Sequence, residues 1–114
     1  MASDFELASQ LHSFMEAVPV LWTWERLRLM HEANESHTEQ RGPGDNIFQF
    51  RLSVLEDELK YGDRYLHLLV SITDPRRKTG ERGSSTTPLS ASFLFFQNGE
   101  TDMPLAREIY ERSY

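Results

Sequence analysis

The sequence predicts an α+β protein in which helices cover an antiparallel sheet. Residues 48–54 and 66–73 alternate apolar and polar side chains with the period of two that is typical of strands with one buried face. A third alternating run, residues 89–95, ends near the turn dipeptide Asn98-Gly99. We therefore expect an N-terminal helix packed on a meander of three to four strands, followed by a short C-terminal helix.

The length, charge and composition of the chain restrict the classes of protein to which it can belong. The chain has 114 residues, a net charge of -6 and no cysteine. One hydrophobic core suits this length, so residues 1–114 are expected to form a single domain. The lack of cysteine excludes disulfide frameworks and thiolate metal sites, and it favours a cytoplasmic location. The acidic charge makes nucleic acid a disfavoured partner.

Neither membrane insertion nor secretion is expected. No apolar run approaches the roughly 20 residues that a membrane-spanning helix needs. The first residues also lack the basic and apolar regions of a signal peptide.

A capping box predicts the first helix. Ser3 and Glu6 have the spacing at which each side chain satisfies a free backbone amide, so the helix should begin near Asp4. One apolar stripe at helical spacing follows: Leu7, Leu11, Phe14, Met15 and Val18. Pro19 is expected to end the helix.

Residues 20–31 fit two structures. Trp22 and Trp24 on either side of Thr23 have the composition of a strand, and the following strands need a partner. We therefore predict a strand. A helix that begins at Pro19 is the alternative, because proline is well tolerated in a first turn.

The strand signals are strongest in the second half of the chain. The apolar positions are Phe48, Phe50, Leu52 and Val54, then Leu66, Leu68, Val70 and Ile72, then Leu89, Ala91, Phe93 and Phe95. Residues 61–63 offer a turn between the first two runs, which should pair as a hairpin. Asn98-Gly99 predicts a type I′ turn and a brief return strand over residues 100–103.

The last helix is expected to start after a cap at Thr101 or Asp102, with Pro104 in its first turn. The opposite face of the sheet is also semi-apolar, with Ile47, Tyr65, Leu69, Leu94 and Phe96. Such a face needs a cover. The terminal helix, a partner protein or a second copy in a homodimer would provide it.

Two long connections, residues 33–45 and 74–88, should emerge at the same end of a meander. The first region is acidic and the second is basic, so together they predict a partner-binding rim. Its candidate residues are Glu32, Glu35 and His37, and Arg76, Arg77, Lys78 and Arg82. A second acidic patch, Glu56, Asp57 and Glu58, is expected at the opposite end of the sheet.

No sequence motif indicates an enzyme. The chain has no GxSxG motif and no phosphate-binding loop, and the histidines lack the HExxH spacing of a metalloprotease. We assign no catalytic residue, no metal ion and no cofactor. Four aromatic residues are candidates for a pocket between helix and sheet: Trp22, Trp24, Phe48 and Phe50.

Together these features favour a small acidic protein-binding module that docks to another protein, as inhibitors, immunity proteins and assembly chaperones do. The alternative is a small-molecule-binding or weakly enzymatic α+β domain with a pocket between helix and sheet.

Overall fold

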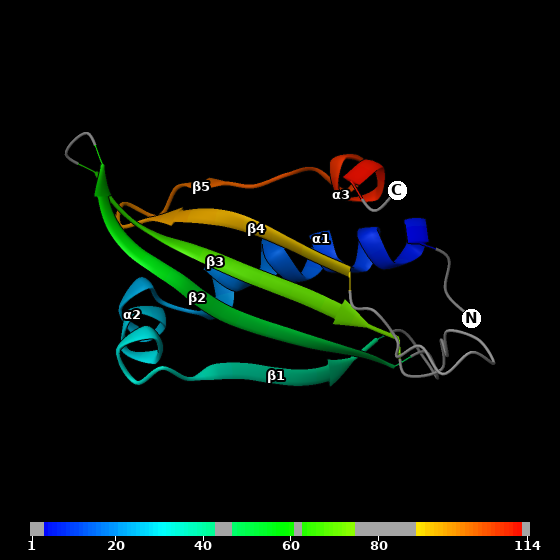
Figure 1. Ribbon diagram of the computed structural model, residues 1–114, viewed down its shortest axis with the longest axis horizontal. Coiled ribbons are helices and arrows are strands. Elements are labelled where there is room, and N and C mark those ends of the chain that lie inside the picture. Colours follow the sequence, from blue (N-terminus) through cyan, green and yellow to red (C-terminus); the bar gives the residue numbers. More distant parts are fainter. Residues whose placement is uncertain (1–3, 43–46, 61–62, 75–88, 113–114) are drawn as a thin grey trace.

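The computed structural model describes residues 4–42, 47–60, 63–74 and 89–112. The elements are α1 (Asp4–Leu21), α2 (Trp24–Glu32), β1 (Ser36–Arg41), β2 (Phe48–Lys60), β3 (Asp63–Thr73), β4 (Leu89–Phe96), β5 (Thr101–Asp102) and α3 (Ala106–Arg112). All strands join one antiparallel sheet in the order β1-β2-β3-β4-β5 (Figure 1). The predicted α+β class is confirmed, with one strand more than expected.

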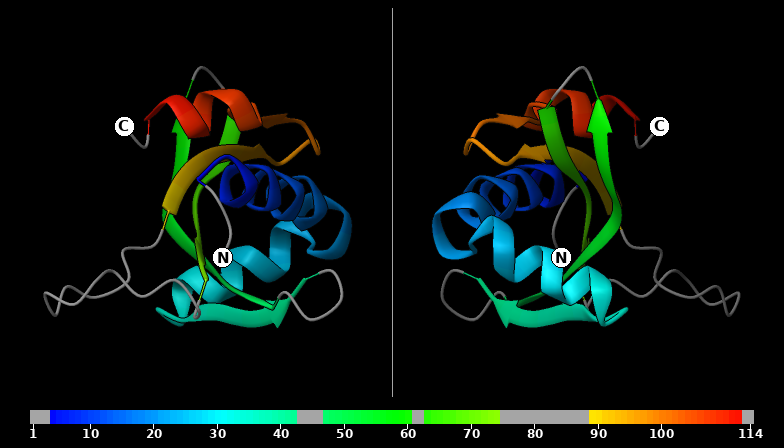
Figure 2. Two further views of the ribbon diagram at one scale, coloured as in Figure 1. Left: turned by 90° about the vertical axis from the view of Figure 1, so that its right-hand side faces the viewer. Right: turned by 90° about the vertical axis from the view of Figure 1, so that its left-hand side faces the viewer.

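The helices α1 and α2 lie on the same face of the sheet (Figures 1 and 2). α1 contacts β3 and β4, whereas α2 contacts mainly β2, and α3 packs against α1. The core fills the space between these two layers. Its largest fully buried side chains are Phe14, Phe48, Phe50, Phe93, Leu11, Met15, Leu27, Leu52, Leu66, Leu68, Ile72 and Ile109.

The apolar stripe of α1 is buried as predicted, from Leu7 to Val18. The predicted end at Pro19 is wrong, because α1 continues to Leu21 with Pro19 inside its last turn. Proline removes one backbone donor there. Val18 and Trp22 are both buried and are joined by a hydrogen bond from the Trp22 amide to the Val18 carbonyl at 2.8 Å, so packing and this bond stabilise the last turn. Ser3, the first residue of the predicted capping box, lies outside the described residues.

The strand predicted over residues 20–31 is wrong, because most of this segment is α2. The helix begins at Trp24 rather than at Pro19, with Thr23 as its N-cap. The Thr23 hydroxyl accepts a hydrogen bond from the Arg26 amide at 3.1 Å. Trp24, Leu27 and Met30 are buried at a spacing of three, which is the spacing of one helix face.

The end of α2 is a Schellman motif. Asn34 has φ 55, in the left-handed region, and its amide donates to the His31 carbonyl at 3.0 Å. The Glu35 amide donates to the Met30 carbonyl, also at 3.0 Å. The chain thereby reverses direction and enters β1.

β1 occupies part of the segment that was expected to be a long loop, residues 33–45. It pairs with the first half of β2, from Ser36 opposite Ser53 to Arg41 opposite Phe48. Its sequence, SHTEQR, has no apolar residue, so hydrophobic periodicity could not reveal it. β1 is preceded by a helix and not by the predicted strand. Glu32 and Glu35 therefore lie near the start of β1, and not at its other end, where β1 is connected to β2.

β2 and β3 form the predicted hairpin, with a register shift between Val54 and Glu56 that makes Leu55 a β-bulge. A bulge leaves a ladder carbonyl without its regular partner. The Val54 carbonyl lies 3.2 Å from Nδ1 of His31, so this nitrogen carries the hydrogen and donates it. α2 is thereby attached to the bulge.

The turn after β4 is in the predicted place but is not type I′. Gly99 has φ 97, whereas Asn98 does not have a positive φ. The Gly99 amide donates to the Phe96 carbonyl at 2.9 Å, and the Phe96 amide donates to the Glu100 carbonyl at 2.8 Å. This pattern is a type I turn followed by a glycine bulge. The predicted return strand is β5.

α3 starts two residues after Pro104, so this proline precedes the helix rather than occupying its first turn. Its Ile109 is buried in the core beside α1. α3 lies along the edge of β4 beyond β5, and it does not cover the second face of the sheet (Figures 1 and 2). On that face Tyr65 is buried, Leu69, Leu94 and Phe96 are half-buried, and Ile47 is exposed.

Candidate functional site

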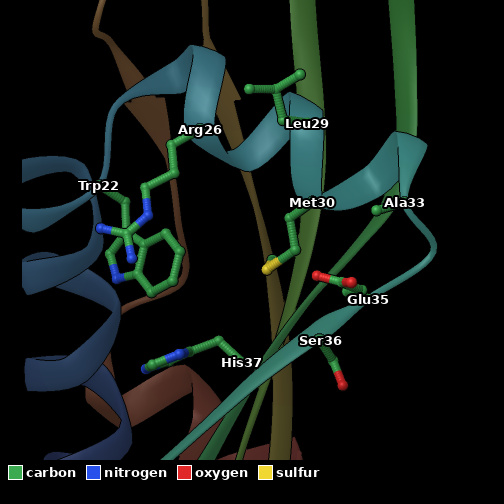
Figure 3. A pocket seen from close by; sticks show the side chains of 8 residues that line it. All are labelled: Trp22, Arg26, Leu29, Met30, Ala33, Glu35, Ser36 and His37. Carbon is green, nitrogen blue, oxygen red and sulfur yellow. The ribbon is translucent and has the colours of Figure 1, made fainter.

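A groove of about 440 Å³ lies between α2 and the start of β1 (Figure 3). We call it the α2–β1 groove. Its lining residues are Trp22, Arg26, Leu29, Met30, Ala33, Glu35, Ser36 and His37. The Thr23 cap places Trp22 and Arg26 at one end of α2, and the Schellman turn returns the chain so that β1 forms the opposite wall.

Trp22 lies at one end of the groove, and Figure 3 shows Arg26 from α2 and His37 from β1 converging on it. The Arg26 guanidinium carbon lies 4.0 Å from the Trp22 ring centre, a cation–π contact. The His37 ring meets the indole edge-on, with ring centres 4.6 Å apart. His37 Nε2 also lies 3.5 Å from Oε1 of Glu39, which fixes the outer side of the imidazole.

The apolar part of the groove comes from α2. Met30 is buried and its side chain points into the groove, whereas Leu29 is 61% exposed and its side chain points away from Trp22 and His37 (Figure 3). Val20 and Leu21, just before Trp22 in the chain, are also exposed. Exposed apolar side chains that lie next to one another are typical of interaction sites.

Arg26 occupies an unfavourable position in its helix. It is the third residue after the Thr23 cap, where glutamate would complete a capping box. A cation in the first turn also opposes the helix dipole, at a cost of about 0.3–1 kcal/mol. No carboxylate of the described residues forms an ion pair with Arg26. Residues that break a local rule of this kind are candidates for function.

A charge cluster of Arg28, Asp57 and Arg64 lies beside the groove, on the other side of α2. Arg64 donates to Asp57 through Nε (3.0 Å to Oδ1) and Nη2 (2.8 Å to Oδ2). Arg28 lies between three carboxylates, at 3.5 Å from Glu25, 3.4 Å from Glu32 and 3.6 Å from Asp57. The hydrogen bonds from Arg64 lower the pKa of Asp57, and partial burial opposes that shift.

The cluster is structural. Asp57 and Arg64 are joined by two hydrogen bonds, whereas Arg28 Nε is buried without a hydrogen bond and interacts with Asp57 through charge alone. The Arg64 guanidinium also lies 5.4 Å from the centre of the Trp24 ring. Bidentate arginine–carboxylate pairs hold two elements in one geometry. We conclude that the cluster attaches α2 to the distal half of the β2–β3 hairpin.

A second hollow of about 440 Å³ lies between α1 and the end of β1. Arg41 lines it, with its guanidinium carbon 4.9 Å from the centre of the Phe14 ring and 5.5 Å from that of Phe50. Gln10, Ser13 and Ala17 of α1 supply the other wall. β1 therefore has a hollow beside each of its ends.

The structure divides the predicted site residues among different places. Trp22, Glu35 and His37 line the α2–β1 groove, although they had been assigned to a pocket and to a rim separately. Trp24 lies under Arg64, and Phe48 and Phe50 are fully buried in the core. The four basic candidates Arg76, Arg77, Lys78 and Arg82 lie outside the described residues.

The acidic candidates are also separated. Glu32 and Asp57 meet at Arg28. They were expected at opposite ends of the sheet, and α2 brings them together because it folds back along β2. The Tyr65 hydroxyl donates to Glu58 at 2.6 Å, and this bond, with burial, raises the pKa of Tyr65. Glu56 is exposed.

Sequence reasoning missed Arg26, Leu29 and Met30 in the groove and Arg28 and Arg64 in the cluster. A threonine three residues before Arg26 was the one available signal, because it fits an N-cap. The predicted strand concealed it.

Within residues 4–42, 47–60, 63–74 and 89–112, no three histidine or acidic side chains are grouped closely enough to hold a metal ion. No helix in the same part of the chain is both long and apolar enough to cross a membrane. Comparison with known proteins finds no matching family, no matching curated protein and no matching solved structure.

Proposed function

We propose that this protein is a small protein-binding module that docks a partner protein in the α2–β1 groove. The main support is the position of Arg26. Its guanidinium stacks on Trp22, at a helix position that disfavours a cation, and the exposed Leu29 is nearby. Tryptophan and arginine are the residue types that most often dominate binding energy at protein interfaces.

The groove suits a partner segment with an apolar side chain next to a carboxylate. The apolar side chain would pack against Met30, with Leu29 at the exposed rim, and the carboxylate would accept hydrogen bonds from the fork of Arg26. Trp22 holds that fork in place, so little side-chain entropy is lost when the partner binds.

Inhibitors, immunity proteins and assembly chaperones act in the proposed way, through one docking surface and without a catalytic group. We propose a cytoplasmic site of action, because a chain without cysteine suits a reducing compartment. Arg76, Arg77, Lys78 and Arg82 stay proposed as a basic contribution to partner binding.

The groove is tested by capture of partners with the tagged protein from its native cells, after nuclease treatment, with identification by mass spectrometry. Leu29→Gln should reduce recovery of a stoichiometric partner at least tenfold. Leu105→Gln is the matched control, because Leu105 is also 61% exposed but lies just before α3. Equal recovery with both variants would contradict docking in the groove.

Arg26→Glu supplies a second test that does not depend on lost stability. Glutamate completes a capping box with Thr23 and favours the helix dipole, which offsets loss of the contact with Trp22. The free energy of unfolding should therefore stay within about 1 kcal/mol of wild type, while partner recovery falls. Unchanged recovery would remove Arg26 from the site.

A small anionic molecule is the second candidate ligand. The volume of the groove, about 440 Å³, falls within the range of about 300–1,000 Å³ that is usual for ligand pockets. Native mass spectrometry of the protein purified from its own cells distinguishes the two. A retained small mass that Arg26→Glu abolishes would favour the ligand, whereas a bare chain and a captured protein would favour docking.

A further inference from the structure

We infer that a second copy of this chain pairs antiparallel with β1, centred on Thr38, so that two sheets join into one. Such pairing would assemble two copies of the chain, whereas the proposed docking engages a different protein. The two edges of the sheet differ. The edge beyond β4 is covered by β5 and α3, whereas β1 forms the opposite edge and nothing in the described part of the chain pairs with its outer side (Figure 1).

A long, uncovered edge strand presents free backbone donors and acceptors. Its side chains then decide what pairs with it. In β1, His37, Glu39 and Arg41 lie opposite the buried residues Leu52, Phe50 and Phe48, so they point to the helix-covered face. Ser36, Thr38 and Gln40 point to the open face and are exposed.

The helix-side residues alternate between acidic and basic types. Glu35, which precedes the strand and lines the groove with His37, is followed at every second position by His37, Glu39 and Arg41. Two of the four have no ion-pair partner among the described residues, namely Glu35 and Arg41. They stand at the two ends of the segment.

A two-fold axis through Thr38 makes this segment complementary to itself. In an antiparallel pair, residues directly opposite each other point to the same face. The axis at Thr38 sets Glu35 opposite Arg41 of the second copy and His37 opposite Glu39 of the second copy. On the open face Ser36 meets Gln40 and Thr38 meets Thr38, so every pair is compatible.

The neighbouring registers are not compatible. An axis through His37 sets Glu35 opposite Glu39, and an axis through Glu39 sets two Glu39 side chains together. Like charges directly opposite destabilise a sheet. An axis further along the strand leaves fewer paired residues. Charge therefore selects both the second copy as occupant and Thr38 as the centre.

The native chain has no cysteine, so disulfide trapping tests the register directly. Two opposed Cα atoms lie about 4.5–5.5 Å apart, which a disulfide spans. Thr38→Cys should therefore form a disulfide-linked dimer rapidly under mild oxidation. Gln40→Cys, equally exposed in the same strand, should not, because its two copies would lie about 14 Å apart.

A mixture of Ser36→Cys and Gln40→Cys should give the mixed dimer and little of either self-dimer. Sedimentation of the cysteine-free protein should show a mass that rises from one copy to two with concentration. A monomer at every concentration would overturn the inference. A dimer in which Gln40→Cys crosslinks as fast as Thr38→Cys would also overturn it and would favour another surface, such as the open sheet face.

Discussion

At the scale of single residues, Asp57 shows how one side chain can join two elements. It extends from the helix-side face of β2, is only 15% exposed, and accepts two hydrogen bonds from Arg64 of β3. Arg28 of α2 lies on its other side at 3.6 Å. A carboxylate in this position needs both cations, because burial without a partner would be costly.

Asp57→Asn is expected to lower the free energy of unfolding by about 1–2 kcal/mol near neutral pH. The figure is kept low because Arg64 is 39% exposed and solvent screens the pair. Since folding lowers the pKa of Asp57, its stabilising effect is present above the unfolded-state pKa of about 3.9 and is lost as the pH falls through the folded-state value.

Urea unfolding of wild type and Asp57→Asn over a pH series checks this expectation. The difference between them should be constant near neutrality and should shrink below about pH 4. Glu56→Gln is the control, because Glu56 is an exposed neighbour in the same strand. A difference that persists undiminished in acid would contradict the ion-pair explanation.

At the scale of elements, α2 is the piece on which the site depends. Thr23 starts it, the Schellman turn at Asn34 ends it, and His31 attaches it to the bulge of β2. These three contacts are hydrogen bonds at or near the ends of the helix. The helix is therefore positioned by its ends and its one buried face, which leaves Arg26 and Leu29 free to line the groove.

Asn34→Gly is expected to stabilise the protein by about 0.5–1 kcal/mol. Asn34 has φ 55, and glycine adopts this left-handed conformation without the clash that a Cβ atom causes. Thermal unfolding followed by circular dichroism measures the change in midpoint. The same substitution at Asn98 is the contrasting control.

Asn98 does not have a positive φ, and its Oδ1 accepts the Glu100 amide at 2.9 Å. Asn98→Gly should therefore lower the midpoint. A loss of stability with Asn34→Gly would mean that the Asn34 side chain makes a contact that outweighs backbone strain.

At the scale of the whole molecule, the two edges of the sheet differ. One is shortened to the two residues of β5 and flanked by α3, whereas the other exposes the six residues of β1. Natural proteins usually protect an open edge with charges or by covering it. The alternating acidic and basic residues of β1 match those of a second copy.

Dimer formation through β1 makes thermal stability depend on protein concentration. Each copy acts as a ligand of the other, and a ligand that binds only the folded chain raises the midpoint of thermal unfolding. The midpoint of wild type should rise as the protein is concentrated. Glu39→Lys should remove most of that rise, because it replaces the carboxylate that faces His37 of the second copy. Gln40→Lys, on the other face of β1, should keep it. A rise unchanged by Glu39→Lys would place the dimer contact elsewhere.

Much of the fold could be predicted because its signals are local. The alternation of apolar and polar side chains from Phe48 to Val54 and from Leu66 to Ile72 indicates which face of each strand is buried. The apolar stripe of α1 likewise indicates the buried face of that helix. The candidate site could be predicted only in part. Trp22, Glu35 and His37 were identified as separate candidates, and nothing in their order showed that they share one groove.

The α+β class, the β2–β3 hairpin and the apolar stripe of α1 follow from the sequence alone, because burial of one face imposes a periodic pattern. Tertiary contacts were needed to establish that most of residues 20–31 is helix and that the polar segment Ser36–Arg41 is a strand. α2 has both buried and exposed apolar residues, which blurred its period. β1 is held by backbone hydrogen bonds to β2, and such bonds leave no hydrophobic pattern in a sequence.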